Sequence, residues 1–306
     1  MGQYNYYSFV TFLPFFDSVC YNTHGMGVTP QISTKWGEEM EYVKEFFGIG
    51  GYTRTPEGAY SWQHLTFAGL SLALMVGLAV WLGLRNRHAD EKAKTRVILW
   101  AAVLIDGFEL IKIAIACYNA TLDGDVWYHG ILNNLPLFLC SIQLIALPLA
   151  AFTRGRLQAA SLDFVAVFGL LGAVMGIIGA AQNYNAYPVL GFTNVVSAIT
   201  HGISGFASLY LLIAGAAPLT KKDMPITMGI LTGFSVMAYG ANLLLDKNYM
   251  FLMAGDGTPY DILLNLVGGS PVWYPLSVMA LFFIYIGVFY GVCHALRKRR
   301  PVTVSV

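Results

Sequence analysis

The feature that most constrains this chain is a series of apolar runs, each about twenty residues long. A run of this length can cross the hydrocarbon core of a bilayer as a helix. Of the 306 residues, 56% are hydrophobic and 11% are charged, and the mean hydropathy is +0.58. Soluble domains carry about twice that share of charge. The sequence therefore predicts an all-α, polytopic membrane helix bundle.

Seven apolar runs divide the chain into spans and connections. The expected transmembrane helices cover residues 63–84, 97–117, 131–152, 161–181, 190–214, 225–245 and 272–295. They leave an aromatic-rich extracytoplasmic arm over residues 1–62, a membrane domain over 63–296 and a basic cytoplasmic tail over 297–306. Within the arm, residues 35–47 have the pattern of a short amphipathic helix. No internal repeat is obvious, so an inverted-repeat transporter gains no support.

The basic residues outside the spans set the expected orientation. Those on one side are Arg85, Arg87, Lys92, Lys94, Arg96, Arg154, Arg156, Lys221, Lys222, Arg297, Lys298, Arg299 and Arg300. Those on the other side are Lys35, Lys44, Arg54 and Lys247. Because cytoplasmic connections carry the excess of Lys and Arg, the N-terminus is expected outside and the C-terminus in the cytoplasm. We expect a multi-pass protein of the bacterial inner (plasma) membrane.

The cysteine count and the net charge bear on cofactors and partners. Four cysteines in a chain of this length give neither a disulfide framework nor zinc-ligand spacing. We therefore expect no cofactor and no metal. Cys20 and Cys117 both fall near the expected outer face, where an oxidising compartment would allow them to pair. A net charge of +1 gives no reason to expect a nucleic acid partner, and membrane lipids are the expected surroundings.

Three ionisable residues interrupt the second span. Asp106, Glu109 and Lys112 are spaced by three and so follow one stripe of a helix. Ionisable groups inside a span are costly and are candidate site residues. Glu109 and Lys112 have the spacing of a structural ion pair, and the same stripe would also suit the charged wall of a polar cavity.

A thiol, an imidazole and a carboxylate are expected at one depth in the membrane. Cys140 follows Pro136 in the third span, and His201 shares a helix face with Asn194 and Ser197 in the fifth. Helix rise places Glu109, Cys140 and His201 roughly 12–17 Å below the outer boundary. These groups suit a nucleophile, its base and an orienting carboxylate. In the alternative reading Cys140 packs as a small apolar residue and His201 is a hydrogen-bonded packing residue.

The long outer connection between the sixth and seventh spans is a candidate binding element. Long connections that form no regular structure of their own are often lids or binding loops. Asn248 and Tyr249 lie in it, and with Asn194, Ser197, Asp106 and Lys112 they complete the candidate substrate-binding set. Trp273 and Tyr274, where this connection meets the last span, also fit ordinary interface anchors.

Two strings in the chain resemble those of a known family. They are Leu135-Pro136-Leu137-Phe138-Leu139-Cys140 and Asn248-Tyr249-Met250-Phe251-Leu252, joined by His201 and by Trp273-Tyr274. Over residues 46–295 the chain resembles the YwaF-like integral membrane proteins, which are related to transmembrane protein 164. The resemblance implies a seven-helix fold and a phospholipid acyltransferase with Cys140 as the acyl-accepting nucleophile and His201 as its base. Phe138 departs from the family pattern, which has His there.

Three hypotheses follow for the function. The first is a Cys/His acyltransferase that forms an acyl-thioester on Cys140. The second is a carrier or binder of a small polar solute, whose path Asp106, Glu109, Lys112 and His201 would line. The third is a non-catalytic subunit of a larger membrane complex, with residues 1–62 as the docking arm, which the Phe138 departure favours.

Overall fold

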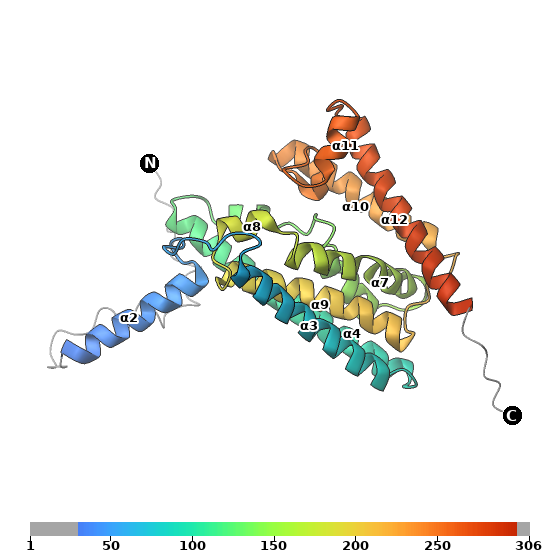
Figure 1. The fold of residues 1–306 in the computed structure, drawn as a ribbon, viewed down its shortest axis with the longest axis horizontal. Helices are drawn as coiled ribbons and strands as arrows, with labels where there is room; N and C mark the ends of the chain where they lie inside the picture. Colours follow the sequence, from blue (N-terminus) through green and yellow to red (C-terminus); the bar gives the residue numbers. More distant parts are fainter. Residues whose placement is uncertain (1–29, 299–306) are drawn as a thin grey trace, which may run out of the picture. The chain divides into compact units, whose positions relative to one another are not determined.

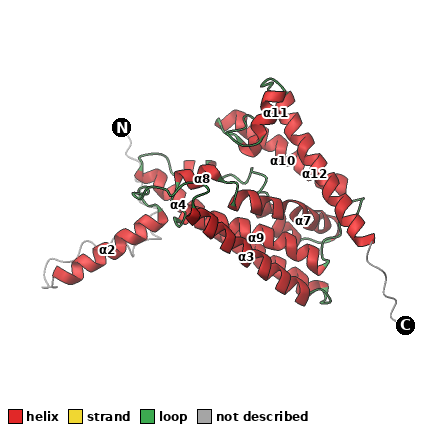
Figure 2. Cartoon of the chain, in the orientation of Figure 1, coloured by secondary structure: helices red, strands yellow, loops and turns green. Residues whose placement is uncertain are grey.

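The computed structural model describes residues 30–298, and every regular element in that range is a helix (Figure 2). Contacts divide the chain into residues 1–44 and 45–306, and each unit is considered by itself. In the first unit the described part belongs to α2 (Pro30–Phe47), which contains the amphipathic helix predicted over residues 35–47. Cys20, the first part of the predicted arm and residues 299–306 lie outside the described residues.

Eleven further elements make up the described part of the second unit (Figure 1). They are α3 (Trp62–Arg85), α4 (Glu91–Leu122), α5 (His129–Leu132), α6 (Gln143–Phe152), α7 (Gly155–Ile177), α8 (Ala181–Ala186), α9 (Phe192–Ala214), α10 (Met224–Leu245), the short 3-10 helix η1 (Tyr249–Phe251), α11 (Tyr260–Leu266) and α12 (Trp273–Lys298).

Five stretches within residues 30–298 are long and apolar enough to cross a membrane, by length and composition. They are α3, α7 with α8, α9, α10 and α12. The all-helical, multi-pass class predicted from the sequence is thus confirmed, and the count of seven spans and the orientation stay predictions. The predicted second and third spans fall on α4 and α6. α4 carries Asp106, Glu109 and Lys112 in its apolar stretch, and α6 has only 10 residues.

The core of the bundle forms around α7, which packs on α6 and α9, while α9 also packs on α3 and α4. Small residues let α7 and α9 approach closely. A side chain at Gly169 would overlap the backbone oxygen of Ser204, and the Ser208 hydroxyl donates a hydrogen bond to the Ala166 carbonyl at 2.7 Å. Close backbone approach through small and hydroxyl residues is the usual packing device between helices in lipid. The ring of Phe168 fills the space toward α12.

The third predicted span differs from a continuous helix. Residues 133–142 form turns, and the regular helix begins only at Gln143. Pro136 supplies no backbone N–H and disfavours helical geometry at Leu135. The remaining bonds are turn-like, such as those from the Leu137 N–H to the Leu135 carbonyl and from the Gln143 N–H to the Cys140 carbonyl. Cys140 therefore lies in irregular backbone just ahead of α6.

A buried carboxylate joins α7 to α10 and α12. Asp163 on α7 is fully buried and accepts hydrogen bonds from the Leu219 N–H at 2.8 Å and the Tyr290 hydroxyl at 2.9 Å. The Tyr290 hydroxyl is also bonded to the Thr227 hydroxyl at 2.9 Å. One polar cluster thus connects three helices and the α9–α10 connection in otherwise apolar packing.

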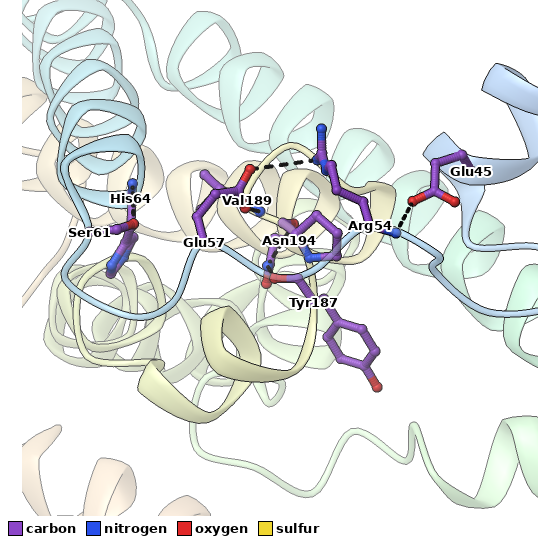
Figure 3. Close-up of polar contacts among 9 residues, drawn as sticks. Glu45, Arg54, Glu57, Ser61, His64, Tyr187, Val189 and Asn194 are labelled. Atoms are coloured by element: carbon purple, nitrogen blue, oxygen red, sulfur yellow. Dashed lines mark hydrogen bonds and ion pairs between the residues drawn. The ribbon is translucent and has the colours of Figure 1, made fainter.

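The segment of residues 45–61, here called the strap, is bonded to the connection between α8 and α9 (Figure 3). Glu45 accepts hydrogen bonds from the backbone N–H groups of Thr53 and Arg54. Glu57 accepts one from the Val189 N–H at 2.8 Å and faces Arg54 at 3.8 Å. Glu57 therefore links the strap to the α8–α9 connection by one charge-assisted hydrogen bond, while the bonds of Glu45 and the Arg54–Glu57 ion pair hold the strap itself together.

The strap ends at a buried histidine on the first turn of α3. His64 accepts a hydrogen bond at Nδ1 from the Tyr60 N–H, which leaves Nε2–H to donate to the Ile177 carbonyl at 3.0 Å. Its ring also stacks on Tyr184 with the centroids 3.7 Å apart. His64 thereby ties α3 to the end of α7.

We expect the Asp163 cluster to be needed for stability. Tyr290→Phe removes one hydrogen-bond donor from a buried carboxylate, which should lower the free energy of unfolding by about 1–3 kcal/mol. The measurement is thermal unfolding of the detergent-solubilised protein. As a control, Tyr118→Phe removes an exposed hydroxyl and should change the free energy of unfolding by less than about 0.5 kcal/mol. Equal melting of the two variants would contradict the role of the cluster.

Acid should loosen the strap. Although partial burial raises the pKa of Glu57, the Val189 N–H and the charge of Arg54 outweigh it and hold the pKa below its ordinary value of 4.5. A carboxylate with a lowered pKa stabilises the fold at neutral pH, and this contribution is lost as the pH falls through the folded-state value. Glu57→Gln should therefore flatten the fall in melting temperature between about pH 7 and pH 3. Glu39→Gln, at an exposed position, should leave the profile unchanged.

Candidate functional site

A polar cavity of ≈ 50 Å³ lies between α4, α9 and the segment that leads into α6. Its lining is Ile105, Glu109, Lys112, Cys140, Ser141, Leu144, Ser197, Thr200, His201 and Ser204. Eight of these ten side chains carry a polar or ionisable group, in a bundle whose other buried residues are mainly apolar. A cavity of this volume has room for a few water molecules. The structure thus brings the candidate residues Glu109, Lys112, Cys140, Ser197 and His201 together around one space.

The Cys140 thiol and the His201 imidazole line this cavity together and interact electrostatically. His201 Nδ1 lies 2.7 Å from the Ser197 carbonyl oxygen, one turn earlier on α9. Since a carbonyl only accepts, Nδ1 must carry the proton, and Nε2 of the neutral ring is left as the acceptor. The Ser141 side chain lines the cavity next to Cys140. The thiol therefore faces an imidazole in the tautomer that can take its proton.

The adjoining wall of the cavity is an ion pair. Lys112 Nζ lies 2.6 Å from Glu109 Oε1, one turn apart on α4, with Glu109 buried and Lys112 partly exposed. The sequence suggested either an ion pair or the wall of a polar cavity. In the structure Glu109 and Lys112 form the ion pair and also line the cavity. Asp106, one turn earlier, is half-buried and does not line it. The lysine charge acts on the His201 ring as well.

Two glycines on α7 make room for the pair. A side-chain carbon at Gly176 would overlap Cδ2 and Nε2 of His201, and one at Gly172 would come within 3.3 Å of the Cys140 Cβ. The two positions are one turn apart and so face the same way. α7 can therefore lie directly against the Cys140–His201 pair only because these two positions lack side chains.

The other predicted substrate-binding residues lie outside the cavity. Asn194 is buried, and its amide donates to the Tyr187 and Pro188 carbonyls, both at 3.0 Å (Figure 3). Asn248 bonds to the Ala254 carbonyl and to the Asp256 carboxylate, each at 2.7 Å. These bonds shape the backbone of the connections, and a part in substrate binding stays a prediction.

Tyr249 reaches from the α10–α11 connection to the irregular segment ahead of Cys140. Its hydroxyl donates to the Leu132 carbonyl at 2.6 Å, and its backbone is held on both sides by the Asn242 side chain. Phe138, the residue that departs from the family pattern, packs edge-on against the Tyr249 ring with centroids 5.1 Å apart. Phe138 is not among the residues that line the cavity. The two motif strings thus meet in an aromatic contact.

Sequence reasoning missed several residues of the site. Ser141, Thr200 and Ser204 line the cavity, and Gly172 and Gly176 lie against Cys140 and His201. Thr200 and Ser204 could have been found, because they flank His201 by one and three positions on an amphipathic helix. The two glycines carried no such signal, since glycine is common in membrane helices. Within residues 30–298 no group of three or more His, Cys, Asp or Glu residues could hold a metal ion.

Fold and site together define a class: a multi-pass, all-helical membrane protein with a thiol–imidazole pair at a polar cavity among its helices. Residues 59–290 match the TMEM164 family, and the chain belongs to this family. The match covers the described helices from α3 to the greater part of α12 and includes both motif strings. Comparison with curated proteins and with solved structures gave no match.

Gly176→Ala should disturb the Cys140–His201 pair without replacing either residue. The added carbon overlaps the His201 ring, so the ring must move, at a cost of about 1–3 kcal/mol in stability. Alkylation of Cys140 should then slow by about tenfold or more, because the displaced imidazole no longer takes the thiol proton. Rates are read by mass spectrometry of the Cys140 peptide.

Gly202→Ala is the matched control, because it adds the same carbon next to His201 on α9 but into open space. Its alkylation rate should equal that of the unmodified protein. A Gly176→Ala variant that alkylates at the unmodified rate would show that the ring position does not govern the thiol.

Proposed function

We propose that this protein is a membrane-embedded acyltransferase that carries a fatty acyl group on Cys140 as a thioester between two lipid molecules. The observation that carries the proposal is the Cys140–His201 pair, with its imidazole tautomer fixed by the Ser197 carbonyl, at a polar cavity among apolar helices. A thiol that transfers its proton to a neighbouring imidazole is a nucleophile suited to acyl transfer. The resemblance to relatives of transmembrane protein 164 implies the same chemistry.

In the first half-reaction Cys140 takes the acyl group. The thiol proton moves to His201 Nε2, and the sulfur bonds to the carbonyl carbon of a phospholipid ester. The ester C–O bond then breaks, and His201 returns the proton to the departing oxygen. The products are an acyl-thioester on Cys140 and a lysolipid with a free hydroxyl. The Ser197 carbonyl keeps the ring aimed at the sulfur through both proton transfers.

In the second half-reaction a lysolipid hydroxyl takes the acyl group. His201 accepts the hydroxyl proton, the oxygen bonds to the thioester carbon, and the C–S bond breaks to leave Cys140 to regain the proton. A negative charge develops on the carbonyl oxygen in both halves and needs nearby donors. Ser141 and Ser197 carry hydroxyls at the cavity and suit this role better than Asn194, whose amide is already engaged.

Glu109 completes the proposed catalytic set. Its carboxylate lies on the same cavity and can offset the charge that His201 gains when it holds the proton. Lys112 keeps Glu109 in place through the 2.6 Å ion pair, and Asp106 lies one turn away on the same helix. Lys112 is partly exposed and is proposed, with Tyr249 and Asn248, to meet the polar part of the lipid.

The proposed setting is the bacterial plasma membrane. In the proposed topology, with seven spans and the N-terminus outside, the cavity would lie in the outer half of the bilayer and could meet phospholipid substrates there. Other membrane subunits are proposed to dock on residues 1–62. Carriage of a polar solute finds less support, since no internal repeat of the kind typical of transporters is obvious in the sequence.

The test is an acyl adduct on Cys140. Purified protein is incubated with an acyl-labelled phospholipid, and the adduct is released by hydroxylamine and mapped by peptide mass spectrometry. We expect the adduct in the unmodified protein and none in Cys140→Ala. His201→Gln should slow its formation by about 10²–10⁴-fold, the usual contribution of a general base.

Cys117→Ala and Cys293→Ala are the matched controls, because both are half-buried cysteines on other helices. Both should keep the adduct. An unmodified protein that gains no adduct on Cys140, or a Cys140→Ser variant with full transfer activity, would refute the proposal.

A further inference from the structure

A second pocket, of ≈ 150 Å³, lies at the other end of α4 and shares no residue with the cavity at Cys140. Its lining is Glu91, Lys94, Thr95, Ile98, Ala150, Gln158, Leu162, Leu211 and Ala216. These residues come from α4, α6, α7, α9 and the connection after α9. The acyl transfer proposed above makes no use of this pocket.

Lys94 is the unusual group in this pocket. Its side chain is only 11% exposed, yet its ammonium has one protein acceptor within the described residues, Glu91 Oε1 at 3.1 Å. An ammonium carries three N–H donors, so two of them point to no protein acceptor. The Glu91 side chain is 80% exposed, and solvent screens its charge. A buried cation with two open donors is stabilised by an anionic or polar occupant of the pocket.

The charges around the pocket favour an anion. The pocket lies at the N-terminus of α4, where backbone N–H groups give a positive end. The nearby segments carry basic residues: Lys92 and Arg96 on α4, Arg87 in the α3–α4 connection, Arg154 in the α6–α7 connection and Arg156 on the first turn of α7. The acidic residues on α4 here are the N-cap Asp90, which bonds to the Ala93 N–H, and Glu91. Basic residues therefore outnumber acidic ones in these segments, and the charged side chains that line the pocket itself are Lys94 and Glu91.

We propose that this pocket binds a phosphate group, carried by a phospholipid headgroup or free in solution, through the Lys94 ammonium. The two open N–H donors of Lys94 suit phosphate oxygens, for which lysine is a common point-charge ligand. The apolar side chains of Ile98, Leu162 and Leu211 line the rest of the pocket and suit the glycerol part of a lipid. This inference is independent of the proposed acyl transfer.

The experiment is native mass spectrometry of the full chain in mild detergent, with phosphatidylglycerol, with diacylglycerol and with inorganic phosphate. We expect tight binding of at least one phosphate-bearing probe and none of diacylglycerol. Lys94→Gln should weaken that binding by about tenfold or more, the usual cost of a lost charged hydrogen bond. Lys92→Gln is the control, since it removes the same charge from an exposed position on the same turn, and it should change binding by less than about twofold.

Each outcome decides the proposal. If inorganic phosphate displaces the lipid, the pocket takes the phosphate of either source, and if only the lipid binds, the source is the headgroup. Ala216→Leu fills the pocket while leaving Lys94 in place and should weaken binding as well, so a poorly folded Lys94 variant would not end the test. The proposal is overturned if neither phosphate probe binds, if diacylglycerol binds equally well, or if Lys92→Gln and Lys94→Gln weaken binding equally.

Discussion

The architecture depends on one constraint, the need to satisfy backbone hydrogen bonds inside an apolar bundle. A continuous helix meets this need by itself, but residues 133–142 are not helical. Irregular backbone at membrane depth is tolerated where it is buried in protein or lines a polar cavity, and this segment is mostly half-buried and lines the cavity through Cys140 and Ser141. The Tyr249 hydroxyl bonds to the Leu132 carbonyl just before it, and Asn134 bonds to the Gly130 carbonyl. Cys140 is thus presented by a turn rather than a helix.

The connection after α10, which supplies Tyr249, has an unusual backbone conformation. Met250 and Phe251 have φ angles of 57° and 55°, in the left-handed region that non-glycine residues rarely adopt. Such geometry costs on the order of 1–3 kcal/mol per residue and persists only when the surroundings fix it. Asn242 fixes it by bonding to both the N–H and the carbonyl of Tyr249. The strained backbone at Met250 and Phe251 therefore accompanies the contact of the Tyr249 ring with Phe138.

Much of the fold could be predicted from the sequence, because apolar runs of membrane length are a strong and local signal. The Cys140, His201 and Glu109 set was also within reach from the sequence, although the depth expected for Cys140 rested on a helix that residues 133–142 do not form. The irregular backbone over residues 133–142 could not be predicted, because a proline in an apolar run can either begin a helix or interrupt one. Asn194 shares a face with His201, yet it holds the α8–α9 connection, and only the path of that connection reveals this.

The Glu109–Lys112 pair determines the electrostatic field at the cavity wall. With 2.6 Å between the charges, a molecule at the cavity meets a dipole and no net charge. The field of a dipole falls off faster with distance than that of a lone charge, so it acts mainly on polar bonds that come close. In the proposed acyl transfer, an uncharged ester would enter without displacing a counterion, and its carbonyl would be oriented only next to the thiol. The pair thereby provides local polarity in a bundle that is otherwise apolar.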